Sequence, residues 1–144
     1  MAMVIPDACG SDKFPELQGN SHSKERFIKW FHSYVDPIYN MISFYYGKKD
    51  DTPEMDGETT YCLRCSLFHE AKLELGEKAR VDEFVIDSTR SGMGFISQSG
   101  TDLRWNGKEY AKVRYIYVRA YPLIQFIVEG AENYLREKTR ACPQ

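Results

Sequence analysis

The sequence has no excess of positive charge. Its 144 residues carry 19 Lys and Arg against 21 Asp and Glu, which gives a formal net charge of −2 at pH 7. A protein that coats nucleic acid through its overall field is usually basic, so this balance excludes that class. Any contact with RNA or DNA must instead be local.

Long hydrophobic runs and a secretory leader are also missing. The most apolar stretch, residues 115–128, is interrupted by Arg119 and Gln125 and falls short of the roughly 20 apolar residues that a membrane-spanning helix needs. The first residues contain neither the basic region nor the apolar segment of a signal peptide. We therefore expect a cytoplasmic protein that makes no membrane contact.

Cysteine is scarce, with four residues in the chain: Cys9, Cys62, Cys65 and Cys142. Since nothing indicates secretion, we interpret them as reduced thiols. Cys62 and Cys65 form a C-x2-C pair, but no second pair of ligands at similar spacing completes a zinc site. A redox C-x-x-C would follow a strand, and no strand precedes this one. Packing explains the pair, and no metal or cofactor is expected.

The length fits one domain, with no internal repeat and no low-complexity tract. Residues 1–22 are rich in Gly, Ser, Pro, Asp and Asn, which predicts a flexible N-terminal arm. Residues 23–140 are then predicted to form the single folded domain.

Three helical segments are predicted in this domain. Apolar residues recur at steps of three and four between residues 27 and 45, with Pro37 kinking or splitting the helix. A second helix begins at Asp56 and continues to about Leu73, and a last helix extends from near Arg119 to about Lys138. The apolar positions of the first segment are Phe27, Trp30, Phe31, Tyr34, Ile38, Met41, Ile42 and Tyr45.

A β insert at about residues 81–113 separates the second and last helices. Residues 81–87 have the composition of a strand, residues 92–97 that of a glycine-rich turn and short strand, and Asn106-Gly107 is a strong hairpin signal. The fold class predicted is mainly α: an antiparallel bundle of three to four helices with a small β-hairpin insertion before the last helix.

Aromatic residues are dense in the first helical segment, beyond the needs of one helix face. They predict a bundle core, and the alternative is an exposed surface for dimerisation or base stacking. The residues are Trp30, Phe31, Tyr34, Tyr39, Phe44, Tyr45 and Tyr46.

Arg64 and His69 form the strongest candidate for a chemical site. Histidine titrates near physiological pH and can move a proton, and arginine binds phosphate in a bidentate manner. Together they suit attack of a ribose 2′-hydroxyl on a phosphodiester without a metal. An ideal α-helix separates the two by about 140° around its axis, so convergence requires a helix distortion near His69 or a second chain.

An Arg-x4-His arrangement near a helix end, in a small helical bundle, resembles the HEPN superfamily. The resemblance covers mainly the first two long helices. Many members are metal-independent endoribonucleases of toxin–antitoxin, phage-defence and RNA-processing systems, and they usually dimerise with two motifs facing one cleft. The resemblance implies Arg64 and His69 as catalytic residues, a homodimer, RNA or a nucleotide as ligand and, for a toxin, an antitoxin partner.

One position departs from the family pattern. Active members often have Asn, Asp or His after the arginine, where this chain has Cys65. Other members only bind nucleotides or partner proteins, so a non-catalytic HEPN-like binding module is the alternative to the endoribonuclease. A third hypothesis is a structural helical bundle, in which Arg64 pairs with a carboxylate and His69 caps a helix end.

Overall fold

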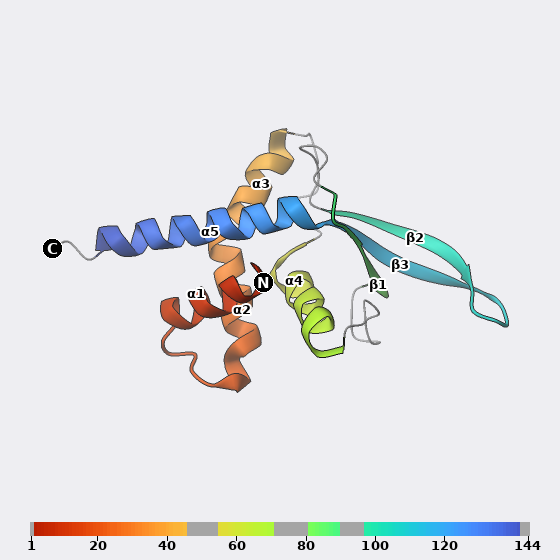
Figure 1. Cartoon of the computed structure of the whole chain (residues 1–144), viewed down its shortest axis with the longest axis horizontal. Helices are drawn as coiled ribbons and strands as arrows, with labels where there is room; N and C mark the ends of the chain where they lie inside the picture. The colour runs from red at the N-terminus through yellow and green to blue at the C-terminus, as the bar shows by residue number, and fades with distance from the viewer. Residues whose placement is uncertain (1, 46–54, 71–80, 90–96, 142–144) are drawn as a thin grey trace.

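The computed structural model describes residues 2–45, 55–70, 81–89 and 97–141, with only the backbone described at 42–45, 69 and 70. Figure 1 shows a group of helices from which a β-sheet extends to one side. The elements are η1 (Ala2–Val4), α1 (Ile5–Lys13), η2 (Asn20–His22), α2 (Ser23–Tyr34), α3 (Asp36–Tyr45), α4 (Gly57–Cys65), the π-helical turn η3 (Ser66–Glu70), β1 (Glu83–Asp87), β2 (Ser97–Trp105), β3 (Tyr110–Arg119) and α5 (Ala120–Ala141).

The fold is α+β, so the predicted helical bundle with a small β-hairpin insertion is wrong. The strands form one three-stranded sheet in the order β1-β3-β2. β2 pairs antiparallel with β3, and β1 pairs parallel with β3. Parallel pairing joins segments distant in sequence, so local patterns predicted the strand and the hairpin but not the sheet they form together.

Helices and sheet share one hydrophobic core. Phe27 and Trp30 of α2 are fully buried, and they belong to the same cluster as Phe84 of β1 and Val118 of β3. Since the sheet contributes to this core, it is a structural layer of the domain and not an appendage to a bundle. The aromatic residues of the first segment with described side chains, Trp30, Phe31, Tyr34 and Tyr39, are buried in the core.

The first helical segment divides at Pro37, as predicted. α2 ends at Tyr34 and α3 begins at Asp36, which places Pro37 in the first turn of α3. A proline is accommodated there because first-turn N–H groups have no partner within the helix. Beyond the break, the predicted apolar positions differ in exposure: Ile38 is buried, whereas Met41 is 56% exposed.

The N-terminal segment is ordered as helix α1, which differs from the predicted flexible arm. Pro6 and Gly10 are buried, and a Cβ at Gly10 would lie 2.9 Å from the Arg26 carbonyl oxygen of α2. At its other end α1 reaches α5, where Lys13 pairs with Glu137 at 2.5 Å. These contacts to distant helices stabilise α1, although its Gly- and Ser-containing sequence has weak intrinsic helix propensity.

The other helix ends follow local signals. The carboxylate of Asp56 accepts a hydrogen bond from the backbone N–H of Thr59 at 2.8 Å, which makes it the predicted N-cap of α4. The predicted end of this helix at Leu73 lies outside the described residues. α5 begins one residue after the predicted Arg119 and has Pro122 in its first turn. No helix in the described ranges has the length and apolarity needed to cross a membrane.

The hairpin predicted at Asn106-Gly107 is confirmed, and its second strand extends beyond the end of the predicted insert. Gly107 has a φ of 98°, and the Asn106 side chain accepts hydrogen bonds from the backbone N–H groups of Lys108 and Glu109 at 2.9 and 3.0 Å. β3 continues to Arg119, beyond the predicted limit of 113. The hairpin projects away from the helices (Figure 1). The turn predicted at residues 92–96 lies outside the described residues.

Candidate functional site

Arg64, one of the two predicted catalytic residues, lies at the end of α4 and is joined to α1. Its guanidinium forms an ion pair with the carboxylate of Asp7, and both side chains are 19% exposed. The guanidinium carbon lies 5.4 Å from the centre of the Tyr61 ring and 5.8 Å from that of Phe68. Ser23 of α2 also donates a 3.5 Å hydrogen bond to Asp7.

The ion pair with Asp7 neutralises the positive charge of Arg64, which a phosphate would need for binding. Asp7 supplies the counter-ion of Arg64, and a phosphate approaching the guanidinium would meet a carboxylate of its own sign. The Nε of Arg64 is buried and has no hydrogen-bond partner in the described part of the chain. The geometry therefore fits the structural hypothesis, in which Arg64 pairs with a helix carboxylate.

His69, the other predicted catalytic residue, lies in the π turn η3. In a π turn the hydrogen bonds join residues five apart, so residues at that spacing lie closer to one face than in an α-helix. The helix is therefore distorted near His69, where a distortion is needed for His69 and Arg64 to lie on one face. The side chain of His69 lies outside the described residues, and its pairing with Arg64 stays a prediction.

Three of the four cysteines lie in the described regions, and none of these three forms a disulfide there. Cys9, Cys62 and Cys65 are free thiols, and burial raises the pKa of Cys62, which lowers its thiolate fraction and reactivity at neutral pH. Ser66 donates a 3.1 Å hydrogen bond to the Cys62 carbonyl oxygen. Across the same residues, no group of three His, Cys, Asp or Glu side chains could hold a metal ion.

A histidine–carboxylate pair joins α2 to α3, and sequence reasoning missed it. The Nδ1 atom of His32 contacts Oδ2 of Asp36, whose residue is only 8% exposed. Burial raises the pKa of the Asp36 carboxyl. A buried carboxylate at Nδ1 fixes the orientation of an imidazole. The signal available in the sequence was the i, i+4 spacing of His32 and Asp36, just before Pro37.

The distal hairpin presents a second group of residues that sequence reasoning did not single out. Trp105 and Tyr110 face each other across β2 and β3, with ring centres 5.4 Å apart and planes at 63°. They are 60% and 70% exposed. The next pair on this face is Leu103 and Lys112. We call these four residues the aromatic face: Leu103, Trp105, Tyr110 and Lys112.

The aromatic face continues a row that is buried closer to the helices. Ile116 and Val118 lie on the same side of β3, at 4% and 1% exposure. The outer part of the row extends past the helices that cover its inner part (Figure 1). The available signal for the aromatic face was the pair of large aromatic residues that flank Asn106-Gly107. The Asn-Gly pair predicted the turn, but nothing in the sequence predicted that the aromatic rings are exposed.

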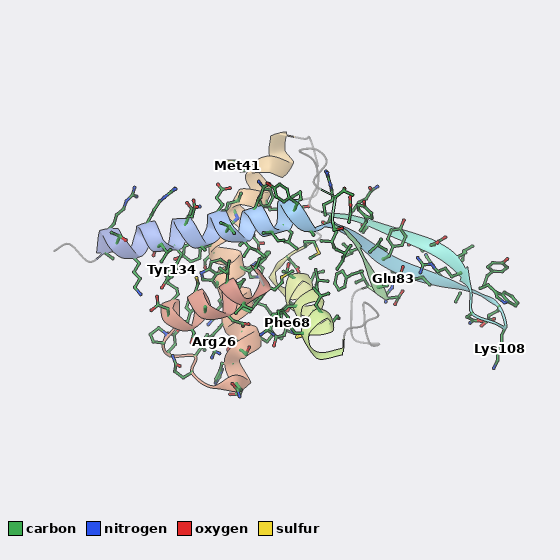
Figure 2. All side chains as sticks on the ribbon, in the orientation of Figure 1. Arg26, Met41, Phe68, Glu83, Lys108 and Tyr134 are labelled. Carbon is green, nitrogen blue, oxygen red and sulfur yellow. The ribbon has the colours of Figure 1, made fainter. Side chains whose placement is uncertain are left out.

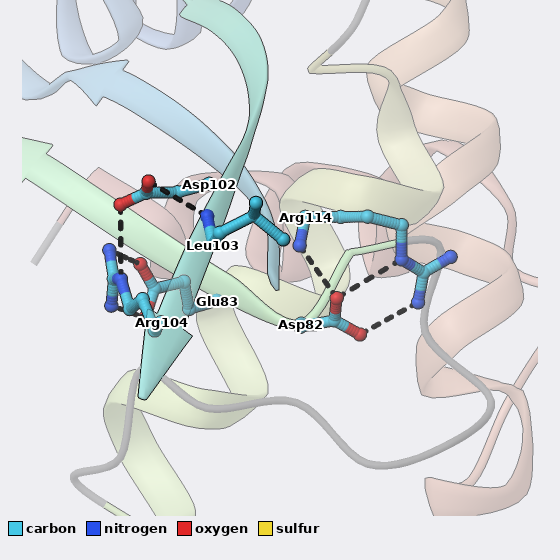
Figure 3. A network of polar contacts seen from close by, with 6 residues as sticks. All are labelled: Asp82, Glu83, Asp102, Leu103, Arg104 and Arg114. Carbon is cyan, nitrogen blue, oxygen red and sulfur yellow. Dashed lines mark hydrogen bonds and ion pairs between the residues drawn. The ribbon is translucent and has the colours of Figure 1, made fainter. Parts of the chain in front are cut away.

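Positive charge is concentrated on this hairpin. Residues 97–119 contain five Lys and Arg against two Asp and Glu, in a chain whose net charge is −2. Figure 3 shows that Arg104 binds Glu83 and Asp102, and that Arg114 binds Asp82. These pairs connect the hairpin to β1 and the residue before it. The side chains of Lys108 and Lys112 have no ion pair with any described residue, and Lys108 lies at the tip (Figure 2).

Comparisons with protein-family models, curated proteins and solved structures find no match to this chain.

Proposed function

We propose that this protein binds single-stranded RNA through the aromatic face of the β2–β3 hairpin and does not use Arg64 for catalysis. The observation that supports this function best is the Trp105–Tyr110 pair, exposed at 60% and 70% on the most basic part of a mildly acidic chain. Exposed aromatic rings stack on unpaired bases whatever their sequence, and nearby lysines neutralise the phosphates.

The surroundings of the pair suit nucleic acid better than a protein partner. Lys112 lies two residues from Tyr110 on the same face, and Lys108 lies in the connecting turn. Neither has an acidic partner among the described side chains, so both are available to phosphate oxygens. The remainder of the chain, outside residues 97–119, has more acidic than basic residues, which confines the proposed contact to the hairpin.

The proposal assigns the protein to the cytoplasm, where single-stranded RNA is available. The three described cysteines are all free thiols, as a reducing compartment favours.

Fluorescence anisotropy with labelled single-stranded RNA tests the proposal. Trp105→Ala and Tyr110→Ala should each weaken binding by about fivefold or more, since stacking on one aromatic residue contributes about 1–3 kcal/mol. Met41→Ala removes an equally exposed apolar side chain from α3 and serves as the matched control. Single-stranded and duplex DNA probes form further arms. Equal affinity of wild type and both aromatic variants would overturn the proposal.

The metal-independent HEPN-like endoribonuclease, acting as a toxin or phage-defence effector, is the second candidate. The π turn at Ser66–Glu70 favours it, because such distortions often occur at functional sites. The test is cleavage of a mixed single-stranded RNA pool in EDTA by wild type and His69→Ala. Cleavage lost only in the variant would support this candidate, and an antitoxin partner would then be sought. RNA binding by a wild type that cleaves nothing would leave the first proposal in place.

A further inference from the structure

A small cavity lies where the helices, the sheet and the N-terminal turn meet, and its volume is about 160 Å³. Its most deeply buried lining residues are Leu63 of α4, Val118 of β3 and Leu123 of α5, at 1%, 1% and 2% exposure. Ile86 of β1, which pairs with Val118 across the sheet, lines it as well. The inner wall of the cavity is therefore part of the hydrophobic core, whose close packing holds its shape.

The cavity is accessible from the protein surface. Leu67 of η3 and Ile124 of α5 line it and are 42% and 43% exposed, so these two side chains mark its mouth. Met3 of the N-terminal turn η1 also lines it and is partly buried. A small molecule can therefore reach the inner wall past exposed side chains, without separation of the buried core residues.

The lining decides which chemistry the cavity accepts. Every side chain that lines it is apolar, so the described lining offers no side-chain charge, donor or acceptor. A polar or charged ligand would lose its hydration there without replacement. Water is also a poor occupant, because a buried water molecule needs about two to four polar partners. An apolar molecule gains by leaving water and by contact with the walls.

The volume of the cavity suits one small ring. Apolar cavities of roughly 150 Å³ stay dry and bind benzene. Two residues on the wall, Ala2 of η1 and Ala120 of α5, are small, and a leucine at either position would occupy part of the space. An empty cavity destabilises a fold in proportion to its volume, so a molecule that fills this one also stabilises the protein.

We infer that this cavity binds a small uncharged apolar molecule, about the size of one six-membered carbon ring. The bound molecule contacts Leu63 of α4, Leu67 of the π turn and Val118 of the sheet, so its binding stabilises the junction of these elements. The lining shares no residue with the aromatic face, and the inference is independent of the proposed RNA binding.

Methyl NMR of the full chain with benzene as the probe tests the site. Titration should shift the methyl signals of Leu63, Val118 and Leu123 to saturation, because a bound ring perturbs the methyl groups that it contacts. Leu135, which is 56% exposed on α5 and does not line the cavity, is the internal control and should shift little. No shift in benzene-saturated buffer, or shifts at Leu135 as large as those at Leu63, would overturn the inference.

Filling the cavity from its wall tests the location. Ala120→Leu and Ala2→Leu should each weaken benzene binding by about tenfold or more, because the added side chain occupies the volume that the ring needs. Ala8→Leu adds the same side chain at an exposed position of α1 outside the lining and should bind benzene like the wild type. The filling positions lie on different elements, so a folding defect of one variant in circular dichroism leaves the other as the test. Wild-type affinity in a folded filling variant would contradict the assigned site.

Pyrazine tests the apolar character of the ligand. It has the shape of benzene but carries two ring nitrogens at opposite positions, so at least one nitrogen would be buried without a hydrogen-bond donor. Pyrazine should therefore bind about tenfold or more weakly than benzene. Equal affinities of the two rings would contradict the inference, because they would show that the cavity does not discriminate against polar atoms.

Discussion

Arg64 near the middle of the chain and Asp7 near its start form an ion pair in which both side chains are 19% exposed. The pair fastens α1 to α4, and the rings of Tyr61 and Phe68 flank the guanidinium. An arginine held in this way contributes to the fold, whatever the role of His69.

The Arg64–Asp7 pair should be worth measurable stability. Asp7→Asn and Arg64→Met should each lower the free energy of unfolding by about 2–3 kcal/mol, because each leaves a largely buried charge without its partner. The double variant should lose less than the sum, since neither charge then remains. Urea denaturation of the four proteins provides the measurement. Strict additivity would show that the two side chains do not interact in the folded protein.

Acid should weaken the contact between the hairpin and the segment before β1. The Arg114 side chain donates hydrogen bonds to Asp82, which lowers the pKa of that carboxyl to about 2. A lowered pKa contributes stability that is complete above the ordinary value of about 3.9 and is lost as pH falls toward 2. Asp82→Asn should therefore be less stable than wild type at neutral pH, with the gap closing between about pH 4 and about pH 2.

Urea denaturation at a series of pH values measures this gap. The control is the same substitution in an Arg114→Gln background, where the gap should depend on pH less strongly, because only the backbone N–H of residue 114 then donates to the Asp82 carboxylate. A gap that persists unchanged at pH 2 would contradict the assigned cause.

Helix α1 should be an integral part of the domain and not a dispensable arm. Gly10→Leu should lower the Tm by about 5–10 °C, because a Cβ at this position meets the Arg26 carbonyl oxygen at 2.9 Å and would force α1 away from α2. Ala8→Leu adds the same side chain at an exposed position of α1 and should change the Tm little. Equal Tm values for the two variants in a thermal melt would show that α1 does not pack as described.

The proposed RNA contact should depend on salt through the hairpin lysines. The logarithm of the binding constant should fall linearly with the logarithm of salt concentration, and each of Lys108→Ala and Lys112→Ala should reduce the slope by about 0.7. Lys24→Ala on α2 provides a control lysine outside the hairpin. If all three variants keep the wild-type slope, these lysines do not contact the phosphates.

Local signals predicted local structure well. Asn106-Gly107 specified a hairpin because its positive φ and side-chain hydrogen bonds form within four residues. Pro37 separated α2 from α3 and Asp56 capped α4 for similarly local reasons. In each case the determining interaction lies within a few residues of the signal.

Long-range contacts account for what the sequence did not indicate. α1 depends on Arg26, Arg64 and Glu137, and the sheet depends on parallel pairing of β1 with β3. Similarly, the sequence allowed Arg64 either to bind a phosphate or to pair with a carboxylate, and it did not identify that carboxylate. Only the fold brings Asp7 to it, so residue type and spacing could identify the chemistry that Arg64 can perform but not the partner that occupies it.

Tryptophan fluorescence during titration with single-stranded RNA tests the central claim most directly. Of the two tryptophans in the chain, Trp30 is fully buried and Trp105 is 60% exposed, so quenching by acrylamide reports mainly on Trp105. The account predicts that RNA quenches this emission and shields it from acrylamide, and that Trp105→Phe abolishes both effects. RNA binding that leaves the emission and accessibility of Trp105 unchanged, or no RNA binding at all, would contradict it.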